Sequence, residues 1–177
     1  MNYPSAYLSY LAEFNGTRDF FECHELLETY WKEHPDDPRA QSWVGLIQLA
    51  VGQYHERRGN LRGAAKMYEK ALSKLDRSSL EQLGLDGKQA ISDLSRRYDC
   101  LQNGQSLPYQ DITLIVKDPE LERQCILLCE SLQADWGSSS PMDMDELIHR
   151  HKLRDRSDVI AERAAAIEAK KRNRAVE

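Results

Sequence analysis

The chain has 177 residues, which is enough for one domain whose core needs no disulfide or metal in order to fold. Its 24 basic and 29 acidic residues give a net charge of -5, which excludes a general attraction of the whole chain to nucleic acid or anionic lipid. The four cysteines form no CxxC pair, no signal-peptide pattern opens the chain, and the longest apolar run, residues 43–52, is shorter than the roughly 20 residues of a membrane span, so we expect a cytoplasmic protein without nucleic-acid or membrane partners.

Apolar residues recur at intervals of three and four along most of the chain, and strand-like runs are short, so the sequence predicts an all-α bundle of about six to eight helices. The first helix is predicted to follow Pro4 and to end near residues 15–16, where a glycine can adopt the left-handed conformation. Asp19 is expected to cap the second helix, with Glu22 completing a capping box. This helix is predicted to end before residues 34–38.

The third helix is predicted to start after the Asp-Pro pair at residues 37–38. It runs to the Gly-Asn pair at residues 59–60, which supplies both a stop and the cap of the fourth helix, residues 61–75. Ser78 and Glu81 have the spacing of another capping box and predict a short helical turn.

Asp86 is predicted to open a further helix with an apolar face, which ends at residues 103–104. Residues 105–117 are expected to form a loop that packs back on the bundle. The Asp-Pro pair at residues 118–119 then predicts a helix that reaches residues 136–137.

The clearest linker is the Gly/Ser/Pro-rich stretch at residues 137–144. It divides the chain into a helical domain of residues 1–136, with a family-like core of about residues 5–104, and a charged helical extension of residues 145–177. Residues 149–174 hold nine Lys or Arg against four Asp or Glu. Because no aromatic residues are interleaved with these charges, the extension is interpreted as a solvated helix rather than a nucleic-acid or membrane patch.

A polar strip follows one flank of the otherwise apolar second helix. Successive side chains rotate by about 100° around a helix axis. His24 therefore lies at the edge of the apolar sector, and Glu28 and Glu25 lie progressively further toward solvent. An imidazole beside carboxylates at such a boundary is half desolvated and can bind a cation or a polar ligand.

The third helix carries a matching feature, because Gly45, Gln48, Gly52 and His55 fall on one side of it. Glycine inside a helix costs about 1 kcal/mol relative to alanine, so the two glycines indicate that another group approaches the backbone closely. If the second and third helices pair antiparallel, their polar sides face each other. His24, Glu28, Gln48 and His55 would then share a pocket, with Glu25 at its edge.

Two interpretations of these residues remain open. In the first, they bind a small polar ligand or a divalent cation. In the second, His24 and Glu28 form an i, i+4 pair that contributes a few tenths of a kcal/mol, and Gln48 satisfies a buried carbonyl group.

Known catalytic signatures do not match the chain. A zinc-protease HExxH motif would need a histidine at Glu28, and a di-iron bundle would need a second Glu-x-x-His besides Glu146 and His149. A phosphate-binding glycine loop and a nucleophile elbow are absent from the sequence as well. Enzymatic activity is therefore left open, and catalytic residues stay unassigned.

Residues 52–72 resemble one tetratricopeptide unit, since Gly52, Ala64, Tyr68 and Ala71 occupy its small and aromatic positions. The pattern does not recur 34 residues later. One such hairpin cannot form the groove of a repeat array, which needs about three units.

Residues 21–31 fill a Phe-x-x-His-Glu-x-x-Glu-x-x-Trp pattern, and Gly45-x-x-Gln48 and the Gly-Asn pair at residues 59–60 follow it. This combination resembles domain-of-unknown-function family number 309, whose members are small helical proteins of bacteria and archaea. The resemblance covers roughly residues 5–75. It implies an all-helical fold distantly similar to tetratricopeptide hairpins, and it brings no established reaction, substrate or cofactor. We assign structural roles to Phe21, Trp31, Gly45, Gly52, Gly59, Asn60 and Ala64.

The first functional hypothesis is a pocket for a small ligand or divalent metal, lined by His24, Glu25, Glu28, Gln48 and His55. The alternative is a non-enzymatic interaction module. It would use the tetratricopeptide-like hairpin or the C-terminal helix to bind a protein partner or a second copy of the chain.

Overall fold

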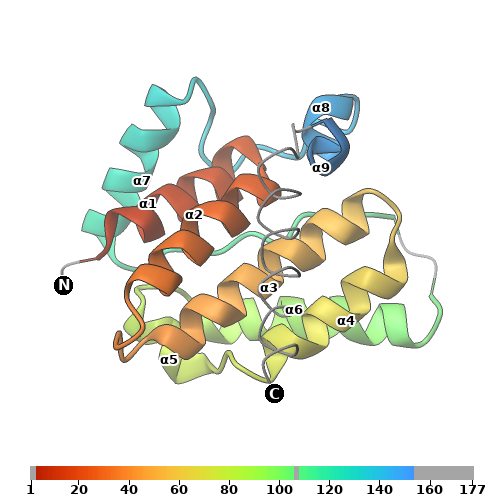
Figure 1. Cartoon of the computed structure of the whole chain (residues 1–177), viewed down its shortest axis with the longest axis horizontal. Helices are drawn as coiled ribbons and strands as arrows, with labels where there is room; N and C mark the ends of the chain where they lie inside the picture. Colours follow the sequence, from red (N-terminus) through yellow and green to blue (C-terminus); the bar gives the residue numbers. More distant parts are fainter. Residues whose placement is uncertain (1–2, 106–107, 154–177) are drawn as a thin grey trace, which may run out of the picture.

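The computed structural model describes residues 3–105 and 108–153, and every named element in these ranges is a helix (Figure 1). Nine are α-helices, six of which have seven residues or more, and one is a short π-helix. Within the described residues, extended backbone pairs at an isolated bridge between Leu85 and Val116. The predicted all-α class is therefore confirmed.

In chain order the elements are α1 (Ser5–Ala12), η1 (Glu13–Thr17), α2 (Phe20–Glu33), α3 (Ala40–Arg57), α4 (Leu61–Leu72), α5 (Arg77–Gln82), α6 (Gly87–Gln102), α7 (Pro119–Ser131), α8 (Asp145–Ile148) and α9 (Arg150–Leu153). Most long helices pack on their neighbours in the chain: α1 on α2, α2 on α3, and α3 on α4. α6 packs on α4 and α5, and α7 returns to α1. One apolar core extends through these helices.

Short polar side chains begin four helices at the predicted positions. Asp19, Asn60, Asp86 and Asp118 each accept a hydrogen bond from a backbone N–H in the first turn of α2, α4, α6 and α7 respectively. Each bond satisfies an N–H group that has no partner inside its own helix.

The first helical stretch ends close to the predicted residues 15–16, but the predicted glycine stop is wrong. α1 continues as η1 to Thr17, and Arg18 adopts the left-handed conformation with φ of 61°. Gly16 remains helical, and a Cβ atom there would lie 2.5 Å from Cys129 Sγ. Its role is therefore to let α7 approach closely rather than to end the helix.

The capping box predicted at Ser78 and Glu81 is also wrong. Asp76 caps α5: its carboxylate accepts from the Ser79 N–H at 2.8 Å, and Ser79 Oγ accepts from the Asp76 N–H at 3.2 Å. Aspartate is as good a cap as serine, and it comes first in the chain. Glu81 pairs with Arg77 at 2.7 Å instead.

α7 ends at Ser131, earlier than the predicted residues 136–137. Gln133 adopts a left-handed φ of 57°, and the Ala134 N–H donates back to the Cys129 carbonyl at 2.9 Å. This local hydrogen bond closes the helix without a glycine.

The two glycines inside α3, Gly45 and Gly52, lie in close contact with α4 and the residues that directly follow it. A Cβ atom on Gly52 would lie 2.4 Å from the Tyr68 ring, and one on Gly45 would lie 2.5 Å from the Leu75 side chain. Because the earlier glycine contacts the later residue, the two arms run antiparallel. Ala64 is fully buried in α4.

The segment between α6 and α7 packs on the bundle, as predicted. Its Ile112, Leu114 and Val116 side chains are buried. The Asn15 amide donates to the Leu114 carbonyl at 2.7 Å and accepts from the Leu114 N–H at 3.0 Å. A buried side chain thus replaces the missing strand partner of this extended backbone.

The predicted linker at residues 137–144 makes side-chain contacts with the bundle. Ser138 Oγ donates to the Gly16 carbonyl at 2.6 Å, and the Ser140 N–H donates to Asp111 at 2.7 Å. The predicted extension of residues 145–177 is described as far as residue 153, and its remainder lies outside the described residues. None of the helices in the described ranges combines the length and apolar character that a bilayer span requires.

Candidate functional site

α2 and α3 pack antiparallel, which is the arrangement on which the predicted pocket depends. The rings of Phe21 and Tyr54 lie 5.9 Å apart between centroids, and those of Tyr30 and Trp43 lie 6.0 Å apart. The start of α2 therefore lies beside the end of α3. This register decides which parts of the two polar strips meet.

A cavity of about 290 Å³ lies where the start of α2 meets the end of α3. His24 and His55, the two histidines of the predicted pocket, both line it. The complete lining consists of Phe20, Phe21, His24, Val51, Tyr54, His55, Arg58 and His151. The cavity thus has aromatic and aliphatic walls with three imidazoles and one guanidinium among them.

The other three predicted site residues are not among the residues that line this cavity. Glu28 and Glu25 contact the His24 ring, with Glu28 Oε2 3.4 Å from Nε2 and Glu25 Oε1 3.2 Å from Nδ1. Glu25 also lines a separate open groove of about 770 Å³ between α1 and α2. The buried Oε1 atom of Gln48 has no hydrogen-bond partner among the described residues.

Arg58 organises the polar side of the cavity. Its Nη2 lies 2.9 Å from His55 Nδ1, and its Nη1 lies 2.7 Å from His151 Nε2. The guanidinium carbon is 5.3 Å from the centroid of the Tyr54 ring. One cation therefore joins α3, α9 and the aromatic wall.

The donor and acceptor roles follow from the chemistry of arginine. A guanidinium has no acceptor, so Arg58 donates in both contacts. His55 Nδ1 and His151 Nε2 must then accept, which places the proton of each neutral ring on its other nitrogen. His55 thus carries an Nε2–H donor, while His151 Nδ1–H donates to the Tyr54 hydroxyl.

The charge in the cavity is carried chiefly by Arg58. Burial, and then the charge of Arg58, lower the pKa of His55, so its ring is neutral at physiological pH. A cation entering the cavity would meet the same repulsion that disfavours the charged form of His55. Within the described ranges, no three His, Cys, Asp or Glu side chains lie close enough together to hold a metal ion.

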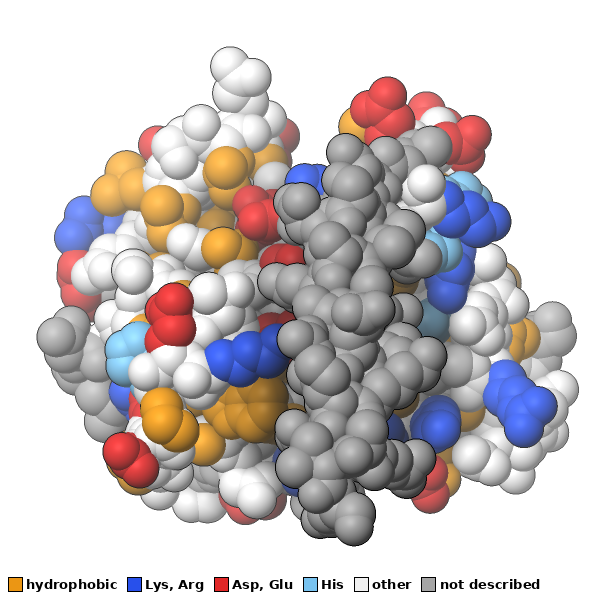
Figure 2. All heavy atoms as spheres, in the orientation of Figure 1, with side chains coloured by type: hydrophobic (Ala, Val, Ile, Leu, Met, Phe, Trp, Pro, Cys, Tyr) orange, Lys and Arg blue, Asp and Glu red, His pale blue; other side chains and the backbone are white. Residues whose placement is uncertain are grey.

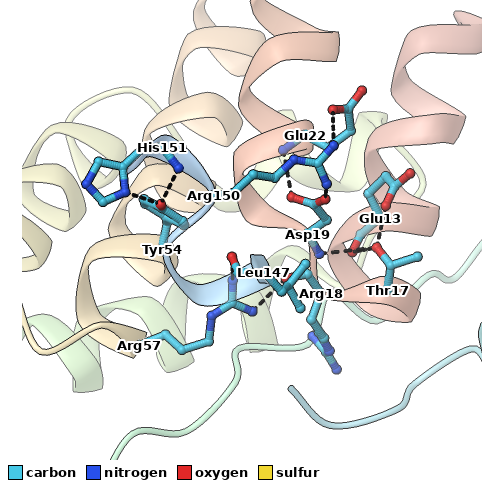
Figure 3. Close-up of polar contacts among 10 residues, drawn as sticks. All are labelled: Glu13, Thr17, Arg18, Asp19, Glu22, Tyr54, Arg57, Leu147, Arg150 and His151. Carbon is cyan, nitrogen blue, oxygen red and sulfur yellow. Dashed lines mark hydrogen bonds and ion pairs between the residues drawn. The ribbon is translucent and has the colours of Figure 1, made fainter. Parts of the chain in front are cut away.

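His151 lies on α9. We call α8 and α9 together the strap (residues 145–153). In Figure 3 the strap lies beside the start of α2 and the end of α3. His151 forms hydrogen bonds with the Tyr54 hydroxyl through its ring and through its backbone N–H. Arg150 pairs with Asp19 and with Glu22, 3.5 Å away. The sequence predicts that Glu22 completes the capping box of α2, but its carboxylate contacts the strap instead.

Charged side chains gather around this part of the surface. Figure 2 shows Lys or Arg and His side chains next to each other below the acidic tip of α8. The acidic tip belongs to the first turn of α8, which carries Asp145 and Glu146.

Two polar groups of the cavity, Arg58 and His151, are not indicated by the sequence patterns described above. Arg58 directly follows α3, where the sequence indicates only a helix stop, although its i+3 spacing from His55 is a usable signal. His151 is 93 positions beyond Arg58 in the chain, and no local pattern indicates that it shares this guanidinium with His55.

Most of the cavity residues lie in a part of the chain that matches a known protein family. A family model described as Domain of unknown function (DUF309) matches residues 7–67, which include every cavity residue except His151. The chain is also 42% identical over 174 residues to the "Uncharacterized protein YpuF" of Bacillus subtilis (strain 168), across 97% of this chain and 99% of that protein. No solved structure matches the chain significantly. The chain therefore belongs to the DUF309 family.

Proposed function

We propose that the cavity binds a small anion with a compact apolar body, such as an aromatic carboxylate or a phosphate monoester. The observation that carries the proposal is that Arg58 and the Nε2–H donor of His55 line the same cavity as Phe20, Phe21 and Val51. The apolar side chains would cover the body of the ligand. The guanidinium and the imidazole would donate to its anionic group.

The size and composition of the cavity fit a small ligand. Its volume of about 290 Å³ lies just below the roughly 300–1,000 Å³ that is typical of small-molecule sites, which suits a compact ligand. The positive charge of Arg58 favours an anion over the divalent cation that the sequence also allows. The four cysteines are free thiols, which suits a reducing compartment such as the cytoplasm. The geometry assigns no reaction to the site.

The proposal is tested by calorimetric titration with phenyl phosphate and benzoate at pH 7.5, with phenol as the uncharged comparison. We expect the anions to bind and phenol to bind more weakly. Arg58→Gln should weaken anion binding by roughly 10- to 100-fold, because a hydrogen bond to a charged group contributes about 1.5–3 kcal/mol. Arg62→Gln is the matched control, since Arg62 is exposed on α4.

Two results would contradict the proposal. One is equal binding of the anions to the wild type and to Arg58→Gln. The other is no anion binding together with a rise in melting temperature on adding Ni²⁺ or Zn²⁺ that His24→Ala removes, because a metal that binds the folded state stabilises it. That second result would support the cation hypothesis.

A further inference from the structure

Part of the attachment of the strap does not involve histidine. Arg150 pairs with Asp19 and Glu22 at the start of α2, and Arg57 Nη2 donates to the Leu147 carbonyl at 3.4 Å (Figure 3). Arginine keeps its charge at all physiological pH values, and carboxylates generally titrate well below histidine. These contacts therefore stay largely constant between about pH 5 and 8.

Other contacts near the end of the strap centre on Arg58 and Tyr54, and those of Arg58 need neutral imidazoles. Arg58 donates through Nη1 to His151 and through Nη2 to His55, and the Tyr54 hydroxyl accepts from the His151 backbone N–H at 3.0 Å. Each imidazole nitrogen that faces Arg58 must carry a lone pair. Protonation of either ring replaces that lone pair with an N–H and places a second positive charge against the guanidinium.

We infer that Arg58 is a pH-sensitive fastening: the His151 end of the strap stays attached while the rings of His55 and His151 are neutral, and this end detaches when they become protonated. A histidine without charged neighbours titrates at about pH 6.5, and the guanidinium charge of Arg58 beside each ring opposes protonation of that ring. The stabilisation of the attached state is therefore fully present above about pH 6.5 and is lost as the pH falls. The lowered pKa of His55 has the same direction.

Two further histidines, His24 at the cavity and His149 in the strap, could also respond to acid. Their response must be distinguished from that of the Arg58 fastening. His24 on α2 lines the cavity, but its ring contacts the carboxylates of Glu25 and Glu28. His149 lies in the strap, and its buried Nδ1 has no hydrogen-bond partner among the described residues. A response to acid that came from His149 would not depend on Arg58.

Detachment would open the cavity, because His151 is one of its walls. The strap would then control access to the site in a pH-dependent way. The fastening does not depend on the identity of a ligand, so it can be tested on the ligand-free chain, and its failure would leave the proposed anion binding standing.

The test is hydrogen–deuterium exchange of the full chain at pH 7.5 and pH 5.5, read on peptides that cover residues 145–153. Each rate is divided by the intrinsic chemical rate at the same pH. We expect the corrected exchange of the strap to rise at least about fivefold at pH 5.5, while peptides from α3 change little. No rise in the strap would overturn the inference.

Variants show whether the rise comes from the fastening. Arg58→Leu should give fast exchange of the strap at both pH values, whereas the control Arg62→Leu should behave as the wild type. The double variant His55→Gln/His151→Gln keeps neutral acceptors at both pH values and should stay protected at pH 5.5. A pH response that persists in the double variant, or that His149→Gln removes, would contradict the inference.

Discussion

Glu56 and Arg97 form a buried ion pair between α3 and α6. Glu56 is 3% exposed and Arg97 is 5% exposed. The pair belongs to a hydrogen-bonded chain, in which Tyr68 donates to Glu56 Oε2 at 2.6 Å and Gln53 donates to Tyr68 at 2.6 Å. Residues this deeply buried stabilise the fold only while every charge keeps its partner.

Removing one member of this pair should therefore be severe. We expect Glu56→Ala to lower the free energy of unfolding by about 3–5 kcal/mol, because it leaves the Arg97 charge buried and unpaired. The double variant Glu56→Met/Arg97→Met should lose less than the single variant. Urea denaturation measures both values, and a double variant less stable than Glu56→Ala would contradict this account of the pair.

Some residues of the cavity can be predicted from the sequence and others cannot. His24 and His55 are predictable because helical periodicity and a short connection are enough to bring the start of α2 to the end of α3. Glu28 and Gln48 are grouped with them because a rotation angle gives the side of the helix that a residue faces. It does not give the position of the residue along the helix axis. Arg58 and His151 depend on tertiary contact with the strap, which a local pattern does not contain.

The connection between α2 and α3 is organised by Asp37. The carboxylate accepts hydrogen bonds from Arg39, from Trp43 Nε1 at 3.1 Å and from the Tyr30 hydroxyl at 3.0 Å. These bonds tie both helices to the turn, and α3 begins at Ala40. Burial opposes ionisation, but the hydrogen bonds from Arg39 and Trp43 outweigh it and lower the pKa of Asp37.

This lowered pKa gives a pH-dependent prediction. A carboxyl group whose pKa is depressed by folding stabilises the protein above its unfolded value of about 4, and this contribution is lost as the pH falls further. Asp37→Asn should cost about 1–3 kcal/mol at pH 7. The difference from the wild type should shrink below pH 4. Urea denaturation at pH 7 and pH 3 checks this, and an equal difference at both pH values would contradict it.

The hairpin of α3 and α4 gives a prediction about packing. Gly52→Ala would place a methyl group against the Tyr68 ring, so we expect it to lower the stability by about 1–3 kcal/mol despite the better helix propensity of alanine. Val51→Ala on the same helix is the matched comparison, because it opens space instead of filling it. Thermal unfolding measures both, and a stabilised Gly52→Ala would show that the ring can move aside.

At the level of elements, the sequence predicts helix starts better than helix ends. An N-cap needs a short polar side chain at one position, and Asp19, Asn60 and Asp86 supply it. The ends of η1 and α7 instead use Arg18 and Gln133 in the left-handed conformation, which is uncommon for residues other than glycine. Arg18 is held there by contacts with distant segments, whereas α7 ends with the local hydrogen bond from the Ala134 N–H to the Cys129 carbonyl.

On the scale of the whole molecule, the bundle is closed by segments that are distant in sequence. Arg18 is 2% exposed and donates to the carbonyls of Phe14, Ile112 and Ser138 and to the Thr113 hydroxyl. It thereby joins η1 to the segment before α7 and to the segment before α8. The strap continues from there to the cavity, so the site combines residues of α2 and α3 with His151 from the distant strap (Figure 1).

The most direct test of the central claim is a titration with phenyl phosphate followed by the amide signals of the chain in ¹H–¹⁵N NMR spectra. The account predicts that the largest shifts fall on Phe21, Val51, Tyr54 and His55, and that Arg58→Gln removes them while Arg62→Gln does not. Shifts confined to the groove between α1 and α2, around Glu25 and Thr29, or shifts that persist unchanged in Arg58→Gln, would contradict it.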